Sequence, residues 1–479
     1  MIAASRGTRW MAVIATAGAL LLFWSTGISD DEIVNDAHQN LWMALNLRNS
    51  GTISLSESPP VVPSMQREPL PAVVGALALS AVDAVLGPAP AADYFHGRRA
   101  ALLKYQNILW LGLLSGAVYL VGRRLGLTFW PALLGVLASN LLLLNAWYRI
   151  CMLNSLLTES AAAALLTVGS VLLAIGGRSG KLRWDSCAGV CFGLLTLVKA
   201  AFFYVTLGLL VAIPGLALLL RRPGRPAIAQ ACIVTGVALG VVLPWMLRNY
   251  LSVGYFEIAG RGGEAVHNRA VIDQMTLDEY IGSLYVWAPY PFGGPLRRVL
   301  GYSRTDLEEG GRLQRLNEAG SSSFAPRDEA AELAARPQDT VTYYRRSRAQ
   351  RRVLQNQFAA AGDPQPEMAA DEEVKRRALA MIARHPLRHA AVTLTLLWRG
   401  GNFVFAPLAA AFIYAVRRRK DELALLVLPS LAVVLFYALL VSFETRYAMP
   451  AYAIVVCLLV APAVRLARRD GGPRAEQRC

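Results

Sequence analysis

Charged residues are scarce in this sequence, where Asp, Glu, Lys and Arg together make up only 17%. A soluble domain usually carries about 25% of these residues. Hydrophobic residues instead reach 55%, and they gather in long runs bounded by Arg, Lys, Gly or Pro. Such runs are typical of membrane-spanning helices, which satisfy their own backbone hydrogen bonds in lipid. The composition therefore argues against a soluble domain and predicts a multi-pass membrane protein.

Two further features are missing from the sequence. Its six cysteines show neither a disulfide framework nor a zinc-site spacing, and most of them fall inside apolar runs. No internal repeat is visible either, which weakens a transporter interpretation because many transporters are built from repeated halves.

The apolar runs predict an all-α polytopic membrane protein with about ten transmembrane helices. These spans are expected near residues 10–27, 105–121, 128–146, 155–175, 186–199, 201–220, 226–246, 402–416, 422–441 and 448–464. One more run, residues 70–87, carries Asp83, and we interpret it as a helix lying on the membrane surface.

The distribution of charge supports this interpretation of residues 70–87. With a cytoplasmic N-terminus and no crossing at this run, the inner segments hold 19 basic and 5 acidic residues, and the outer segments hold 29 and 28. Almost all of the net charge of +15 then lies on one face, as the positive-inside rule requires. We therefore expect a protein of the cytoplasmic (inner) membrane with both termini in the cytoplasm, and no nucleic-acid partner.

This topology divides the chain into five parts. They are the first transmembrane helix (1–27), an outer loop with an acidic motif and a surface helix (28–104), transmembrane helices 2–7 (105–247), a large, partly helical outer loop (248–400), and transmembrane helices 8–10 with a basic cytoplasmic tail (401–479). Juxtamembrane helices are expected in both large outer loops, with residues 376–398 docked on the membrane.

Three carboxylates follow the first predicted helix, in the sequence Ser29-Asp30-Asp31-Glu32. A carboxylate at the lipid boundary is suited to take a proton from an acceptor hydroxyl. The structural alternative is a capping box formed by Ser29 and Glu32 at the start of a helix. The two roles are compatible.

A fourth acid, Glu159, lies at the outer end of a predicted span. A carboxylate in a membrane helix usually faces a cavity or a partner, and Arg149, ten residues earlier, is an available partner. The structural alternative is a simple ion pair between these two side chains. Lys199, at another outer helix end, is interpreted as a cation that snorkels to the interface.

Three more arginines are expected at the outer interface, namely Arg67, Arg248 and Arg446. Guanidinium groups there are suited to bind a lipid phosphate by paired hydrogen bonds. Two of them have a structural alternative, which is a snorkelling anchor for Arg67 and an ion pair with Glu444 for Arg446.

The order of these motifs resembles that of the GT-C membrane glycosyltransferases, in the branch that holds protein O-mannosyltransferases and lipid A aminoarabinose transferases. The resemblance covers nearly the whole chain except about residues 260–380. The matching elements, in order, are Asp31-Glu32, Arg67-Glu68-Pro69-Leu70, Glu159, Pro244-Trp245-Met246-Leu247-Arg248-Asn249 and Arg446-Tyr447-Ala448-Met449-Pro450.

The resemblance implies a cavity open to the outer face and roofed by the first loop, and an inverting transfer of a sugar from a polyprenyl-phosphate-linked donor. Asp31 would act as the base, with Asp30, Glu32 and Glu159 close by. The departing lipid phosphate would be neutralised by the arginines already considered, which are Arg67, Arg149, Arg248 and Arg446. This scheme requires no cofactor and no metal, although clustered Asp residues can hold Mg²⁺ or Mn²⁺.

The chain departs from the family pattern in two places. Val34, Asn35 and Asp36 occupy a stretch where the family often has a Tyr, and Arg67-Glu68-Pro69 replaces the more usual Lys-Pro-Pro. The sugar and the acceptor, which is a glycan, a lipid or a protein, therefore stay open. A transporter or flippase for a lipid-linked sugar, and a non-catalytic scaffold, are the alternative functions.

Overall fold

The computed structural model describes residues 27–289, 291–317, 327–335 and 341–470 of the 479-residue chain. All regular elements in these ranges are helices, with no strand among them. The predicted all-α class is therefore confirmed. The first predicted span, residues 10–27, lies outside the described residues except for Gly27, and so does the end of the basic tail, residues 471–479.

The chain forms two compact units. Unit 1 comprises Met1–Ile258, Ala406–Ala432 and Ala448–Cys479, and unit 2 comprises Ala259–Phe405 and Val433–Tyr447. Unit 2 thus contains most of the predicted large outer loop, together with a second, short segment from near the C-terminus.

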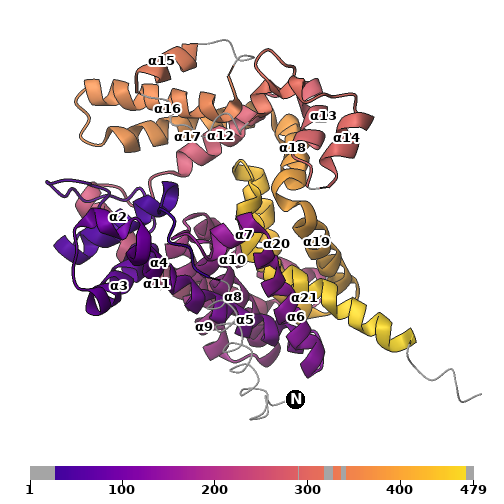
Figure 1. Cartoon of the computed structure of the whole chain (residues 1–479). Coiled ribbons are helices and arrows are strands. Elements are labelled where there is room, and N and C mark those ends of the chain that lie inside the picture. Colours follow the sequence, from indigo (N-terminus) through magenta and orange to yellow (C-terminus); the bar gives the residue numbers. More distant parts are fainter. Residues whose placement is uncertain (1–26, 290, 318–326, 336–340, 471–479) are drawn as a thin grey trace, which may run out of the picture. The chain divides into compact units, whose positions relative to one another are not determined.

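Unit 1 is a helical bundle, drawn mainly in indigo and purple in Figure 1. Within the bundle, successive neighbours are α6, α5, α8, α9, α11 and α10. The helices of this unit are α2 (Asn35–Ser50), α3 (Pro69–Leu86), α4 (Gly97–Lys104), α5 (Gln106–Arg124), α6 (Phe129–Leu141), α7 (Ala146–Met152), α8 (Glu159–Ser179), α9 (Leu182–Val198), α10 (Ala201–Leu219), α11 (Gly224–Val253), and parts of α19 (Asn402–Arg417), α20 (Asp421–Leu440) and α21 (Thr445–Asp470).

Two glycines let α9 and α11 approach closely. A Cβ added at Gly189 would lie 2.7 Å from the carbonyl oxygen of Val234, and one at Gly193 would lie 2.7 Å from the Cβ of Val241. Small residues four positions apart are the usual device for close packing of membrane helices. The α9–α11 contact therefore depends on both glycines.

The helices of unit 1 give the bundle two chemically different ends. Helix α8 starts at Glu159, and 21 residues place its last turn about 30 Å away. At that far end, Arg124 and Arg178 both pair with Glu422, at 2.9 and 2.6 Å. We call this the basic end, and the end that holds Glu159 the acidic end.

Seven helices among the described residues are long and apolar enough to cross a membrane, or eight if a pair bent by 104° at residues 129–152 is one span. The chain is therefore a multi-pass membrane protein. The seven are Pro69–Leu86, Glu159–Ser179, Ala201–Leu219, Gly224–Val253, Pro386–Arg417, Asp421–Leu440 and Thr445–Val464.

This set differs from the predicted spans in three respects. Helices α5 and α9 cover the predicted spans 105–121 and 186–199 but do not meet the same measure of length and apolar character. The helix at the predicted span 402–416 already begins at Pro386 and includes a π-helical turn at Leu397–Gly401, so much of the stretch expected to dock on the membrane belongs to it. By length and composition alone, Pro69–Leu86 is also a candidate span.

Contacts nevertheless place the whole of α3 along the acidic end. Ala72 in its first turn packs with Trp245 and Met246, near the end of α11. Leu79 and Val82 in its second half pack with residues that include Ile33 and Leu156, which adjoin the acidic segment and the start of α8. A helix of 18 residues that crossed beside the bundle would carry its first and last residues to opposite ends of the bundle, about 27 Å apart. These contacts favour the surface position, and the course of α3 through a membrane stays a prediction.

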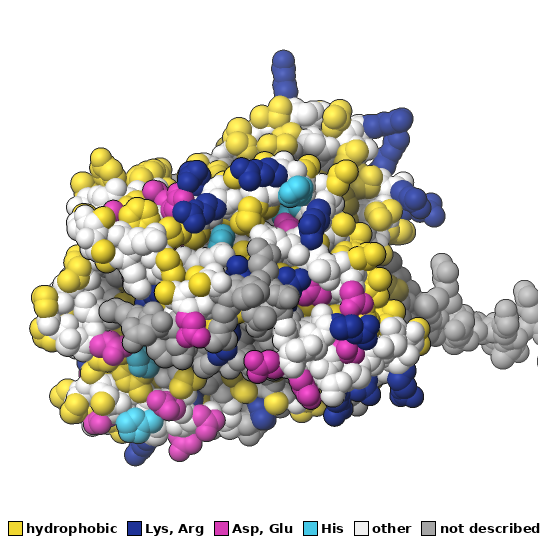
Figure 2. All heavy atoms as spheres, turned by 90° about the horizontal axis from the view of Figure 1, so that it is seen from above, with side chains coloured by type: hydrophobic (Ala, Val, Ile, Leu, Met, Phe, Trp, Pro, Cys, Tyr) yellow, Lys and Arg dark blue, Asp and Glu magenta, His cyan; other side chains and the backbone are white. Residues whose placement is uncertain are grey.

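Unit 2 is a set of shorter helices around a separate core. Its α12 and α17 pack against each other and both contact α16, while the core near α13 includes Val271, Leu313 and Tyr343. On the face of the molecule seen in Figure 2, Lys and Arg lie among Asp and Glu. The remaining helices of unit 2 are α12 (Gly262–Ile272), α13 (Leu277–Val286), α14 (Gly293–Val299), α15 (Arg327–Ala335), α16 (Tyr343–Ala360), α17 (Pro366–Arg384) and α18 (Pro386–Leu396).

Candidate functional site at the acidic end of unit 1

The carboxylates Asp30, Asp31 and Glu32 lie on an extended segment before α2, and all three residues are exposed. We call residues 29–33 the acidic segment. Helix α2 begins only at Asn35, and its N-cap residue Val34 makes no side-chain capping bond. The capping box expected from Ser29 and Glu32 is therefore wrong, because the helix starts several residues later.

The backbone of the acidic segment is fixed from several sides. The ammonium of Lys104, at the end of α4, donates to the carbonyl oxygens of Ser29 at 2.9 Å and Asp31 at 2.7 Å. The amide of Gly97 donates to the carbonyl of Asp30 at 3.0 Å. The amide of Ser29 in turn donates to the side-chain oxygen of Asn154, at 3.2 Å. The main chain is thus held while the carboxylate groups face outward.

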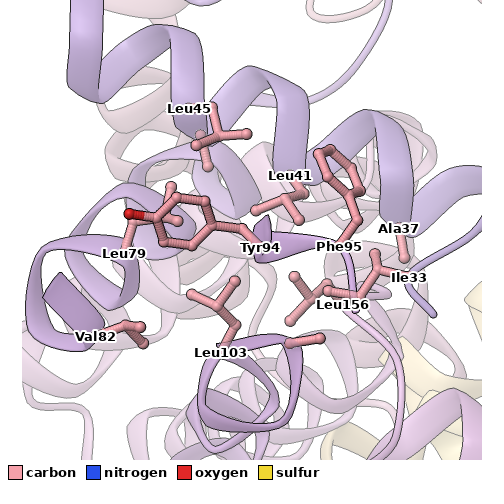
Figure 3. Packing of buried hydrophobic residues seen from close by; sticks show 12 residues of the cluster. Ile33, Ala37, Leu41, Leu45, Leu79, Val82, Tyr94, Phe95, Leu103 and Leu156 are labelled. Carbon is pink, nitrogen blue, oxygen red and sulfur yellow. The ribbon is translucent and has the colours of Figure 1, made fainter. Parts of the chain in front are cut away.

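A hydrophobic cluster supports the segment at its other end. Ile33 is 1% exposed, and its amide donates to the carbonyl of Phe95 at 2.8 Å. Figure 3 shows Ile33 and Phe95 in one cluster with Tyr94, Leu103 and Leu156. An apolar residue directly after three acids therefore anchors them to the bundle.

Lys104 is fully buried, at 0% exposure. Burial lowers its pKa below the ordinary value of a lysine, while the charges of Asp31 and Asp30 act in the opposite direction. The acidic segment therefore supplies the charges that compensate this buried cation.

Arg67 lies against the first turn of α2, directly after the acidic segment. Its guanidinium pairs with Asp36 and donates to the side-chain oxygen of Gln39 at 2.7 Å. The Arg67 side chain is 14% exposed and that of Asp36 is 32% exposed. Arg67 is thus anchored by two side chains rather than snorkelling, and its partner Asp36 is five residues after the predicted base in the chain.

Glu159 pairs with a different cation from the expected one. Its carboxylate accepts a hydrogen bond from Lys199 at 2.8 Å, and its second oxygen is buried with no hydrogen-bond partner among the described residues. The predicted pair with Arg149 is wrong, because Arg149 lies exposed on α7. The snorkelling interpretation of Lys199 is also wrong, since its side chain is only 12% exposed and points to Glu159.

Glu68 connects the Arg67 region with the Glu159–Lys199 pair. Its carboxylate accepts a hydrogen bond from the amide of Ala200 at 2.8 Å, and Ala200 follows Lys199 directly. Contacts from one residue to the next therefore bring Asp36, Arg67 and Glu159 to one region of the acidic end.

A pocket adjoins this region, with a volume of about 500 Å³ including its open mouth. Its walls come from α2, α3, α5 and α8, and they are mainly apolar. Thr158 and Val198, which precede Glu159 and Lys199 in the chain, are among its lining residues. An apolar pocket beside an ion pair is typical of sites that bind molecules with both an apolar and a polar part.

Arg248 holds two loops together at the same end of the bundle. Its guanidinium donates to the carbonyl oxygens of Ser64 at 3.1 Å and Ile53 at 3.2 Å. Trp245 is 9% exposed, and its ring N–H donates to the carbonyl of Ile258 at 2.8 Å. The Pro-Trp-x-x-Arg-Asn element thus donates hydrogen bonds to backbone carbonyls of the neighbouring loops.

The fourth predicted phosphate-binding arginine, Arg446, belongs to unit 2. Its guanidinium pairs with Glu444 at 3.1 Å and lies over the ring of Tyr447. The ion pair with Glu444 that the sequence suggested is therefore present.

A metal site could not be assembled from the described residues, where no group of three or more His, Cys, Asp or Glu side chains is placed to hold an ion. The exposed carboxylates of Asp30, Asp31 and Glu32 belong to this part of the chain and form no such group.

Lys104, Asp36, Glu68 and Asn154 contribute to this site but were not predicted from the sequence. Glu68 had a usable signal, since it lies inside a motif that carries the family resemblance, whereas Asp36 lies in a stretch where the chain departs from the family pattern. Lys104 is one of very few lysines in the chain and precedes a predicted span, which is a weaker signal. Asn154 had none.

No known protein-family model matches this chain, and no curated protein matches its sequence.

Proposed function

We propose that this chain is a membrane glycosyltransferase of the GT-C type, which transfers a sugar from a polyprenyl-phosphate-linked donor to an acceptor. The reaction is assigned to the acidic end of unit 1, on the outer face of the cytoplasmic membrane. One observation carries the proposal. Three exposed carboxylates sit on a backbone that is fixed by a buried lysine, and the helix that follows them carries Asp36, the ion-pair partner of Arg67.

The chemistry proposed for this site is a single displacement. The carboxylate of Asp31 takes the proton of an acceptor hydroxyl, and the oxygen attacks the anomeric carbon of the sugar from the face opposite the phosphate. The bond from that carbon to the phosphate oxygen breaks, and its electron pair leaves with the polyprenyl phosphate. The configuration of the sugar is inverted. Asp30 and Glu32 increase the negative charge around the base.

Positive charge must meet the leaving phosphate as its own charge develops. Arg67 is the best placed arginine, because it lies against the helix that follows the acidic segment. Arg248 also lies at the acidic end, with its guanidinium on the carbonyls of Ser64 and Ile53. Arg149 and Arg446 remain predictions for the same role.

The membrane location also supports a lipid-linked donor. A candidate span starts at Glu159, so its ion pair with Lys199 lies at the end of an apolar helix. A substrate with a polar head and a long apolar chain can place its head at such an ion pair and its chain along the apolar helix. The mainly apolar pocket beside this pair fits the same class of molecule.

The proposed function is tested by Asp31→Asn, which keeps the shape of the side chain and removes its charge. A strain that lacks the protein is complemented with wild-type or variant protein, and its envelope glycans and glycolipids are compared by mass spectrometry. The glycan lost on deletion identifies the acceptor for a transfer assay in nanodiscs. We expect transfer by Asp31→Asn to fall by roughly a hundredfold or more.

Asp93→Asn is the matched control, because Asp93 is an exposed aspartate of the same outer segment. It should transfer at the wild-type rate. Near-normal transfer by Asp31→Asn would move the base to Asp30 or Glu32. Full transfer in all three single variants and in the triple variant would remove the acidic segment from the reaction.

A further inference from the structure

Lys104 joins two backbone carbonyls through hydrogen bonds, as neutral side chains do elsewhere in the same unit. Its ammonium bridges the carbonyls of Ser29 and Asp31, which are two residues apart. The side-chain amide of Asn107, three residues later, bridges the carbonyls of Leu153 and Ser155 at 2.9 and 2.8 Å.

Asn46 makes a third bridge of the same kind. Its amide donates to the carbonyls of Ser54 and Ser56, each at 2.9 Å. Asparagine therefore suffices to join carbonyls spaced in this way, and Asn46 and Asn107 are both buried as Lys104 is. The charge of Lys104 is not needed for the bridging.

A buried ammonium is costly compared with an amide, because the charge loses its hydration. A direct carboxylate partner usually offsets that cost. Here the two nearest acceptors are the carbonyls of Ser29 and Asp31, and the compensating charges come from the outward-facing carboxylates of Asp31 and Asp30. The positive charge thus contacts the backbone that carries the two acids and interacts electrostatically with both of them.

We propose that Lys104 is a positioning residue for the proposed transfer, holding the backbone of the acidic segment in place and supplying positive charge close to Asp31 and Asp30. This inference rests on the proposed function. A cation on the buried side of the segment balances the negative charge of the acids and leaves their outward side free for the acceptor. Lys104 acts through the acids and does not touch the reacting atoms.

Two substitutions separate the two parts of this role. Lys104→Met removes both the hydrogen bonds and the charge. Lys104→Gln removes the charge and keeps an amide that can donate, as Asn107 and Asn46 do. Lys181→Gln, at an exposed lysine before α9, is the control.

Hydrogen exchange measured by mass spectrometry reports on the acidic segment whatever the reaction is. In nanodiscs we expect the amides of Ile33 and its neighbours to exchange at least about tenfold faster in Lys104→Met than in wild type, and close to the wild-type rate in Lys104→Gln. Unchanged exchange in Lys104→Met would overturn the holding role.

The transfer assay then reports on the charge. We expect kcat to fall by about tenfold or more in both variants, with KM for the lipid donor unchanged, because the affected group is the base and not the donor site. Wild-type kcat in Lys104→Gln would overturn the electrostatic role, and so would a rise in KM with kcat preserved. If Lys104→Met does not accumulate, Lys104→Gln alone decides this point.

Failure of this inference is distinguishable from failure of the proposed function. If wild-type protein transfers no sugar and its deletion changes no glycan, the proposed function is wrong, whereas the exchange comparison still decides whether Lys104 holds the segment. If wild type transfers sugar and Lys104→Gln is fully active, only the role of Lys104 is lost.

Discussion

Two groups of carboxylates, one in each unit, occupy opposite environments. In unit 1, Asp30, Asp31 and Glu32 are exposed, while the backbone beneath them is fixed. In unit 2, Glu279 is 2% exposed, and Arg315 and Tyr343 donate to it at 2.6 and 2.8 Å.

The buried acids of unit 2 are fully engaged in holding helices together. Asp273 joins α12 to α18, because it pairs with Arg269 and lies 2.7 Å from the ring Nδ1 of His389. Asp371 accepts the amides of Gly263 and Glu264, at the start of α12. Asp273 and Asp371 are both buried, so these side chains offer little surface to a substrate. Exposed acids on a fixed backbone are suited to chemistry, and enclosed acids are suited to stability.

The largest effect that this comparison predicts is on the stability of unit 2. Burial alone would raise the pKa of Glu279, but the hydrogen bonds from Arg315, Thr276 and Tyr343 hold it below its ordinary value. Glu279→Gln keeps the size of the side chain and leaves Arg315 buried without its counter-charge. We expect a loss of about 3–5 kcal/mol.

Hydrogen exchange of the α13 amides measures this loss in the intact chain. Glu309→Gln, at an exposed acid of the same unit, is the control and should change exchange by less than about 0.5 kcal/mol. A change below 1 kcal/mol in Glu279→Gln would mean that the enclosed acids of unit 2 are not structural, and the contrast between the units would fail.

A somewhat smaller effect is expected from pH, again in unit 2. His267 is 3% exposed and its ring contacts Ser347 at 2.9 Å. Burial, followed by repulsion from Arg377, lowers its pKa to about 4, although Glu264 opposes the shift. Between pH 6.5 and pH 4 the unfolded chain therefore binds a proton that the folded unit does not, and stability falls as the pH falls.

The free energy of unfolding should fall by about 3 kcal/mol between pH 6.5 and pH 4, and it should not change above pH 7 through this residue. The variant His267→Gln cannot take up the proton, so its stability should depend less on pH over this range. The measurement is the exchange of α12 amides in wild type and variant, compared at each pH. If the exchange of α12 amides changes with pH equally in both proteins, His267 is not responsible for the pH dependence.

The sequence predicted the helical class well, because this class follows from patterns along the chain. Apolar runs of sufficient length indicate spans directly. Since α8 starts at Glu159 and α9 ends just before Lys199, antiparallel packing of the two helices brings these distant residues to one end of the bundle.

The partners of the site residues could not be predicted in the same way. Lys199 is 40 residues from Glu159, whereas Arg149 is ten residues away and was chosen because it is near in sequence. The contact of Lys104 with the acidic segment joins residues 73 and 75 positions apart through main-chain carbonyls, which leave no trace in residue type. Tertiary geometry decided both pairings.

The smallest predicted effect concerns Arg67, whose structural role is hardest to separate from a role in binding the donor. Arg67 is anchored to α2 by Asp36 and Gln39, so it resembles the structural arginines of unit 2. The side chain of Arg67 is more exposed than the buried arginines of unit 2, such as Arg269 and Arg315. This exposure and its position near the acidic segment instead favour a contact with the donor phosphate. Arg248 is less suited to this test, because its substitution would also release the carbonyls of Ser64 and Ile53.

Arg67→Ala should lower kcat/KM for the lipid-linked donor by about tenfold, and Arg67→Lys should lower it less, because the charge is kept and the paired geometry is lost. Asp36→Asn provides the decisive comparison. A partly exposed ion pair contributes at most about 1 kcal/mol to stability, so Asp36→Asn should fold normally. If Arg67 binds phosphate, this variant frees its guanidinium and leaves donor use intact or improved. If Arg67 only anchors α2, Asp36→Asn should reproduce the loss seen in Arg67→Ala, and Arg67 would then belong with the structural arginines of unit 2.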